Sequence, residues 1–213
     1  DELIVLDIDA TVEGREPDYK MIENLAAECR IPLCYGGGIK TVEQATRIFN
    51  LGVEKIALSS AVIENLKLVS DISKEVGSQS VVVVIDVKKK MFGGYDIYTH
   101  NGTKKTNIDL EKFIIELQSL GIGEIVINSI DNDGMMQGYD LELLKLTLSN
   151  CNIPVIVCGG AGNFEDLYIG LKNGAHAVAC ASLFHFGDNN PTRARSYLLN
   201  KKIPMKNIKG LIF

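Results

Sequence analysis

The sequence lacks three features that would each indicate a particular class of protein. No apolar run reaches the eighteen or so residues that a membrane-spanning helix needs. Basic side chains are not in excess, because 22 Lys and Arg stand against 27 Asp and Glu, a formal net charge of −5. The three histidines, at 100, 176 and 185, lack the spacing of metal ligands. We therefore expect no membrane association, no nucleic-acid partner, no metal and no cofactor.

Cysteine is also used sparingly, at positions 29, 34, 151, 158 and 180. An odd number without ligand spacing is not the pattern of a disulfide framework or a zinc site. Three of the five lie in apolar, strand-like surroundings, where a buried reduced thiol is expected. Together with the lack of a secretory signal, this usage predicts a cytoplasmic protein.

What the sequence does have is a regular alternation of short apolar runs with segments of helical period. Val- and Ile-rich strands joined by helical crossovers predict an α/β fold with a parallel sheet. One exception is the segment 88–106, where a Gly-Gly and an Asn-Gly pair bracket an alternating stretch and predict a hairpin. The expected strands are 3–8, 32–35, 55–58, 81–85, 124–128, 154–158 and 177–181, and the expected helices are 18–29, 41–51, 62–76, 109–119, 140–149, 164–173 and one after about 190.

Two halves of the sequence repeat each other at an offset of 122 residues. The segments 31–60 and 153–182 share a strand, a double glycine, a helix and a second strand in the same order. Such duplication predicts a (β/α)₈ TIM barrel of two half-barrels. The repeat spacing places one βα unit, roughly 40 residues, before residue 1. We therefore expect a single barrel domain over 1–213 that is incomplete at its N-terminus.

The glycine pairs of the repeat, Gly37-Gly38 and Gly159-Gly160, lie between a strand and a helix. Residues without a Cβ let backbone N–H groups approach an oxyanion, and Ser60 and Ser182 are placed to complete each cradle. We expect two phosphate sites across one barrel mouth, suited to a ligand with a phosphate at each end. The alternative is that the glycines only form tight turns.

Three carboxylates also fall at strand ends. Asp86 follows a run of β-branched residues, so its side chain is expected in the barrel mouth as a proton donor or acceptor. The alternative is that the carboxylate pairs with Lys88 or with a capping group. Asp7 poses the same question, and Asp133 precedes a glycine and would also serve to order a turn.

Several motifs resemble the HisF family, the cyclase subunit of imidazole glycerol phosphate synthase. They are LDIDATVEGRE, YGGGIKTVEQA, GSQSVVVVIDVK, SIDNDGMMQGYD, CGGAGNFEDL and ASLFHF, and they follow the order and spacing of that family. The resemblance implies a barrel that receives ammonia from a glutaminase (HisH-type) partner at its N-terminal face. The implied substrate is a bis-phosphorylated formimino-aminoimidazole carboxamide ribonucleotide, converted to imidazole glycerol phosphate and aminoimidazole carboxamide ribonucleotide. The related sugar isomerase barrel fits the motifs around Asp86 and Asp131 less well.

The resemblance also implies roles for individual residues. Asp86 matches one of two catalytic aspartates, and the other would lie on the strand expected before residue 1. Asp7 and Asp133 match further active-site carboxylates. The ammonia-channel positions match Glu2, Lys55 and Glu124, and the phosphate positions match Gly38, Ser59 and Ser60 for one end of the ligand and Gly134, Gly160, Ala181 and Ser182 for the other.

Four positions depart from the family pattern. Ser59-Ser60 replaces Asn-Thr, Cys158 replaces a serine, and Asn128 replaces a threonine. The stretches IDATVEGREPDY and ECRIPLCYGGGIK look like a HisF paralogue of glycan gene sets. That resemblance implies an alternative function, an ammonia conduit that serves a separate enzyme in the amidation of an acetamido sugar.

Overall fold

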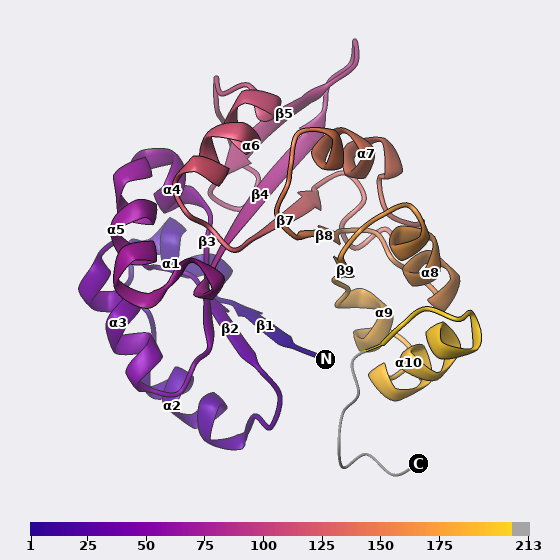
Figure 1. Cartoon of the computed structure of the whole chain (residues 1–213), viewed down its shortest axis with the longest axis horizontal. Helices are drawn as coiled ribbons and strands as arrows, with labels where there is room; N and C mark the ends of the chain where they lie inside the picture. The colour runs from indigo at the N-terminus through magenta and orange to yellow at the C-terminus, as the bar shows by residue number, and fades with distance from the viewer. Residues whose placement is uncertain (206–213) are drawn as a thin grey trace.

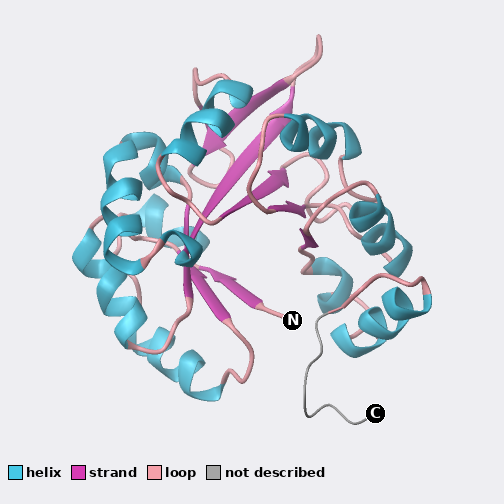
Figure 2. Ribbon diagram, in the orientation of Figure 1, coloured by secondary structure: helices cyan, strands magenta, loops and turns pink. Residues whose placement is uncertain are grey.

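A computed structural model of the chain describes residues 1–205 as a curled sheet covered on its outer face by helices (Figures 1 and 2). Seven strands pair in parallel in the order β1-β2-β3-β4-β7-β8-β9, and two short antiparallel strands extend from β4. The strands are β1 (Leu3–Leu6), β2 (Leu33–Gly36), β3 (Lys55–Leu58), β4 (Val81–Lys89), β5 (Tyr95–Thr99), β6 (Lys104–Lys105), β7 (Glu124–Ser129), β8 (Val155–Cys158) and β9 (Ala177–Val178).

The helices alternate with the strands, as the sequence predicts. Most begin at a polar residue whose side chain accepts a hydrogen bond from a backbone N–H of the first turn, as Asp18, Asp109 and Asp140 do. They are α1 (Ile8–Glu13), α2 (Tyr19–Glu28), α3 (Val42–Asn50), α4 (Ser60–Glu64), α5 (Leu66–Val76), a 3₁₀ turn (Ser78–Ser80), α6 (Leu110–Ser119), α7 (Leu141–Ser149), α8 (Phe164–Lys172), α9 (Ser182–His185) and α10 (Pro191–Asn200). None of the helices in this part of the chain is both long and apolar enough to span a bilayer.

The two faces of the sheet carry different cores. Side chains alternate along a strand, so every second residue points to the helices and the others to the concave side. The helix side holds a large apolar cluster that includes Tyr35, Ile56, Ile85 and Ile127. The concave side holds a smaller cluster of small and medium side chains, namely Cys34, Ala57, Val82, Val84, Val126 and Ile156. The concave core is therefore thin, and polar side chains lie at both of its ends.

The sequence-based element bounds differ from the structure in four places. The helix expected over 62–76 starts earlier and is interrupted at Asn65, whose extended backbone separates α4 from α5. The first strand ends at Leu6, because Asp7 caps the short helix α1, which the sequence analysis missed. β4 runs on to Lys89 because the predicted hairpin pairs Asp86 with Tyr98 and continues the strand. β9 ends at Val178 rather than at 181, and Ser182 begins α9.

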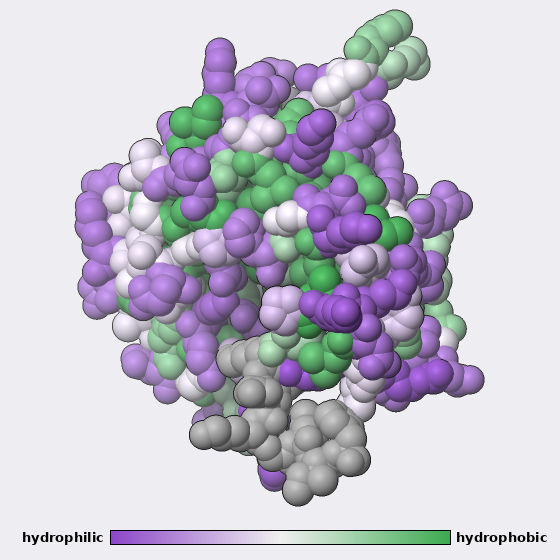
Figure 3. Space-filling view, turned by 45° about the vertical axis from the view of Figure 1, so that its right-hand side comes forward, coloured by the Kyte–Doolittle hydropathy of each residue, from purple (hydrophilic) through white to green (hydrophobic). Residues whose placement is uncertain are grey.

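The curled sheet is open between its two end strands. β1 pairs only with β2 and β9 only with β8 among the described residues, so each has one unpaired edge. Leu6 on β1 is 47% exposed beside this opening. At the far end of β4, the hairpin tip protrudes from the molecule, with Met91 and Phe92 90% and 97% exposed (Figures 1 and 3).

Candidate active site

The concave side of the sheet is built in three layers, and the lowest is charged. Lys55 at the start of β3 donates hydrogen bonds to Glu2 (2.9 Å) and to Glu124 at the start of β7 (2.7 Å). Burial opposes the ammonium charge, but the two carboxylates outweigh it, so the pKa of Lys55 is raised. The structure thus brings together the three residues that match ammonia-channel positions in the family resemblance.

The middle layer is the apolar concave cluster, which separates the charged layer from the mouth. Cys34 belongs to it and is the register partner of Lys55 on the neighbouring strand. Burial, and then the nearby Glu2 carboxylate, raise the pKa of the Cys34 thiol to about 12. The thiol is therefore neutral at physiological pH, so this layer carries no charge.

Asp86 lies in the upper layer, on the concave side of β4, where the sequence predicts it. Its Oδ1 accepts a hydrogen bond from Asn128 Nδ2 on β7 (2.9 Å), and its Oδ2 accepts one from Ser59 Oγ after β3 (3.4 Å). Burial raises the pKa of Asp86, the two donors lower it in part, and the charge of Asp133 raises it further. Its partners are not Lys88, the alternative considered from the sequence. A half-buried carboxyl with a raised pKa is suited to act as a proton donor or acceptor.

Cys158 and Asp133 are close to this carboxyl. Burial raises the pKa of the Cys158 thiol to about 12, and the charges of Asp133 and Asp86 add to that effect. A thiol in this state is a poor nucleophile, because the thiolate is the reactive form. The upper layer therefore favours proton transfer over covalent catalysis by cysteine.

Asp7 lies at the edge of the same mouth but has a structural task. Its side chain caps α1 by accepting from the Ala10 N–H (3.1 Å) and forms an ion pair with Arg15 (3.2 Å). Arg15 also pairs with Glu13, and these hydrogen bonds raise its pKa. The ion pair with Arg15 neutralises much of the charge of Asp7, which distinguishes it from Asp86.

The two glycine pairs repeat each other in space as they do in sequence. A Cβ at Gly37 would overlap the Asp7 carbonyl oxygen, and one at Gly159 would lie 2.6 Å from the Ser129 carbonyl oxygen. Asp7 and Ser129 are themselves related by the 122-residue offset. All four glycines of the pairs have positive φ. Close backbone packing thus requires these glycines, independently of any bound phosphate.

The expected phosphate residues are dispersed over five loops, each of which follows a different strand. Gly38 packs against Arg15 and Gly160 against Gly138, whereas Gly134 has open space beside it. Ser60 begins α4, and its hydroxyl accepts a hydrogen bond from the His100 backbone N–H (3.4 Å). Ala181 and Ser182 stand at the start of α9, on the far side of the mouth.

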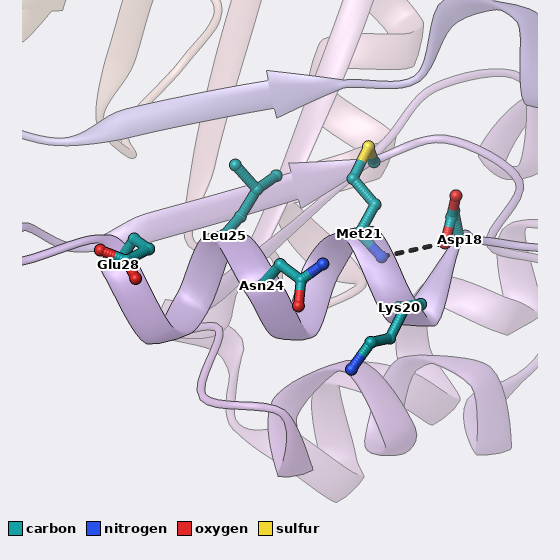
Figure 4. Close-up of a pocket in the computed structure, with 6 residues that line it drawn as sticks. All are labelled: Asp18, Lys20, Met21, Asn24, Leu25 and Glu28. Atoms are coloured by element: carbon teal, nitrogen blue, oxygen red, sulfur yellow. Dashed lines mark hydrogen bonds between the residues drawn. The ribbon is translucent and has the colours of Figure 1, made fainter.

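Two features lie away from this arrangement. A shallow groove of about 520 Å³ runs along α2, lined by Asp18, Lys20, Met21, Asn24, Leu25 and Glu28 (Figure 4). It lies outside the concave face and holds none of the predicted site residues. Within residues 1–205 no three His, Cys, Asp or Glu side chains are grouped as a metal would require.

Sequence reasoning missed three contacts that shape the mouth. They are the Asn128 amide on Asp86, the His100 backbone on Ser60 and the Arg15 guanidinium on Asp7. Asn128 could have been recognised from the sequence as a candidate neighbour of Asp86, because it lies at the end of β7 as Asp86 does on β4. The other two depend on how loops fold back, which the sequence pattern does not encode.

Comparison with known proteins identifies the family. A family model described as "Histidine biosynthesis protein" matches residues 1–190. A Vibrio vulnificus protein provisionally named imidazole glycerol phosphate synthase subunit hisF3 is 49% identical over 99% of this chain and 80% of that protein. A Dictyoglomus turgidum protein named imidazole glycerol phosphate synthase subunit HisF is 42% identical over 95% of this chain and 81% of that protein. The chain therefore belongs to the histidine biosynthesis protein family that includes the HisF subunits of imidazole glycerol phosphate synthase.

Proposed function

We propose that this chain is a cyclase subunit of the imidazole glycerol phosphate synthase type, with Asp86 as an acid/base residue. The observation that carries the proposal is a half-buried carboxyl at the mouth of the curled sheet that Asn128 and Ser59 hold by hydrogen bonds, and whose pKa is raised. The substrate is the bis-phosphorylated formimino-aminoimidazole carboxamide ribonucleotide, which reacts with ammonia to form imidazole glycerol phosphate and aminoimidazole carboxamide ribonucleotide. Asp86 accepts or donates a proton at the reacting nitrogen, and Asp133 supplies a second carboxylate nearby.

Ammonia would reach Asp86 from the opposite end of the concave face. A glutaminase partner docks at the N-terminal edge of the sheet, where Glu2, Lys55 and Glu124 lie. These charges admit ammonia to the apolar layer, which carries it to the mouth. Support comes from the alignment of the three layers along one axis of the sheet.

The same proposal places one phosphate of the substrate near Gly38, Ser59 and Ser60, and the other near Gly134, Gly160, Ala181 and Ser182. Asp7 lines the first site. Gly134 and the start of α9 leave room for an anion, because nothing lies within 4 Å of a Cβ at Gly134. The fold would be a (β/α)₈ barrel, with one further βα unit between β9 and β1 to complete the seven parallel strands.

A second function is favoured by one specific observation. In the first phosphate site the protein itself uses the groups that would bind the anion. The Ser59 hydroxyl donates its proton to Asp86, and the Gly38 backbone packs against the Arg15 carbonyl oxygen. A barrel with this arrangement would serve as an ammonia conduit for a separate enzyme that amidates an acetamido sugar.

One experiment separates the two functions. The full-length protein is supplied with ammonium ions and the bis-phosphorylated nucleotide, and imidazole glycerol phosphate is measured. We expect turnover that falls by at least about 100-fold in Asp86→Asn, since general acid–base catalysis typically contributes that much. Turnover no higher than that of Asp86→Asn would reject the cyclase and leave the conduit.

A further inference from the structure

The strand order places Asp86 between two hydrogen-bond donors. β4 lies between β3 and β7, so Ser59 and Asn128 approach the carboxylate from opposite sides. Asp86 and Asn128 are direct partners in the register of β4 and β7. Each of the two carboxylate oxygens accepts one hydrogen bond, at 2.9 Å and 3.4 Å. The plane of the carboxylate is thereby fixed from two neighbouring strands.

The orientation of the Asn128 amide is informative because it leaves a buried atom unsatisfied. Asn128 Oδ1 has no hydrogen-bond partner although it is buried, and such an atom costs about 1–3 kcal/mol. Turning the amide over would point this oxygen at the carboxylate, and two acceptors would then face each other. The observed orientation is therefore the one that donates to Asp86.

The surroundings hold the amide in this position. A Cβ at Gly159 would lie 2.7 Å from Asn128 Oδ1, so only a glycine leaves room for the side chain. The charge of Asp133 raises the pKa of Asp86, and Asp86 in turn helps to raise that of the Cys158 thiol, but within residues 1–205 neither side chain hydrogen-bonds to Asp86. Asn128 and Ser59 are thus the side chains in the described structure that hydrogen-bond to the carboxylate.

We propose that Asn128 and Ser59 are positioning residues that orient Asp86, with the remaining lone pairs of the carboxylate directed to a proton of the ligand. The effect of this positioning on catalysis rests on the proposed function. The positioning itself does not depend on that function. Loss of either donor would leave the carboxylate less well held and its anionic form less stable. Asn128 has the shorter bond and should have the larger effect.

The test follows the Asp86 carboxyl directly, by carbon NMR of protein labelled at aspartate, with the resonance assigned by its absence in Asp86→Asn. We expect the titration midpoint of Asp86 to rise by about one pH unit in Asn128→Leu and by less in Ser59→Ala. Asn128→Thr, which keeps a donor, should return the midpoint toward that of the wild type. Asn24→Leu on the exposed side of α2 is the matched control and should leave the midpoint unchanged.

Activity gives a second, independent reading. In folded Asn128→Leu, kcat should fall by about tenfold with little change in KM, and the acidic limb of the pH–rate profile should move to higher pH. An unchanged midpoint in both Asn128→Leu and Ser59→Ala would overturn the proposal. A shifted midpoint in a wild-type protein without cyclase turnover would uphold the positioning role and reject only the proposed reaction.

Discussion

Burial and hydrogen bonding act on the Asp86 carboxylate in opposite directions, and burial prevails. The folded protein therefore binds the Asp86 proton more tightly than the unfolded chain does. The stability that Asp86 confers is fully present below its pKa in the unfolded chain, which is about 3.9. That stability is lost as the pH rises through the higher pKa that Asp86 has in the folded protein. A carboxylate retained in such a place indicates a function that neutral residues do not supply.

Asp86→Asn should for this reason stabilise the protein at neutral pH. The amide keeps an acceptor for Asn128 and carries no charge to desolvate, so its free energy of unfolding should exceed that of the wild type at pH 8. The difference should vanish as the pH falls toward 4. Urea unfolding of both proteins between pH 4 and 8 measures it, and a variant that is less stable at pH 8 would contradict the burial argument.

Two of the residues that depart from the family pattern contact the same carboxylate. The resemblance implies asparagine where Ser59 stands and threonine where Asn128 stands, so an amide and a hydroxyl have exchanged places around Asp86. We expect the exchange to be coupled. Ser59→Asn should lower kcat or stability, Asn128→Thr should do so to a lesser extent because threonine keeps a donor, and the double variant should recover most of the loss. A double-mutant cycle with a coupling free energy near zero would show instead that the two positions changed independently.

The position of Asp86 could be read from the sequence, because five β-branched residues fix a buried strand and its alternation fixes the side of the carboxylate. Its partners could not. Asn128 reaches Asp86 through the register of β4 and β7, which are separated in sequence by the hairpin and α6. Contacts of that kind depend on how the strands align in three dimensions.

At the scale of elements, the βα loops show how glycine serves packing. Gly38 and Gly14 both have φ near +70°, but a Cβ at Gly38 would lie 2.7 Å from the Arg15 carbonyl oxygen, and one at Gly14 would meet nothing within 4 Å. Gly14→Ala should cost about 1 kcal/mol from backbone strain alone. Gly38→Ala should cost at least about 2 kcal/mol more, because the α1 loop has to move. Thermal unfolding of the two variants separates strain from overlap, and equal losses would show that the loop yields freely.

Helices and strands of clear period were predicted to within a few residues, whereas short elements were not. α1 and α9 span six and four residues, too short to display a helical period. The break at Asn65 was also missed, because the apolar spacing of the segment continues across it. Local capping decided these elements, as when Asp7 ends β1 and starts α1.

For the whole molecule, the alternation of strands and helices predicted a parallel sheet, and the repeat predicted its curvature. Closure of the sheet depends on what pairs with the backbone edges of β1 and β9. The pattern of side chains along a strand does not predict that pairing. The layered interior is a property of this scale too, because Lys55, Val126 and Asp86 come from different strands. Only the curled sheet places them in succession.

If the interior carries ammonia, narrowing it should slow turnover that depends on ammonia from glutamine but not turnover that depends on ammonium ions added to the solution. Ala57 lies in the concave cluster, and Ala45 of α3 is equally buried in the cluster on the helix side. Replacing either with leucine overpacks a core and should destabilise the protein by about 1–3 kcal/mol. Only Ala57→Leu should lower turnover driven by glutamine and the glutaminase partner relative to turnover driven by added ammonium ions. The measurement is the ratio of the glutamine-driven rate to the ammonium-driven rate, taken for both variants below their unfolding temperatures. If Ala57→Leu leaves this ratio unchanged, ammonia reaches the mouth by another path.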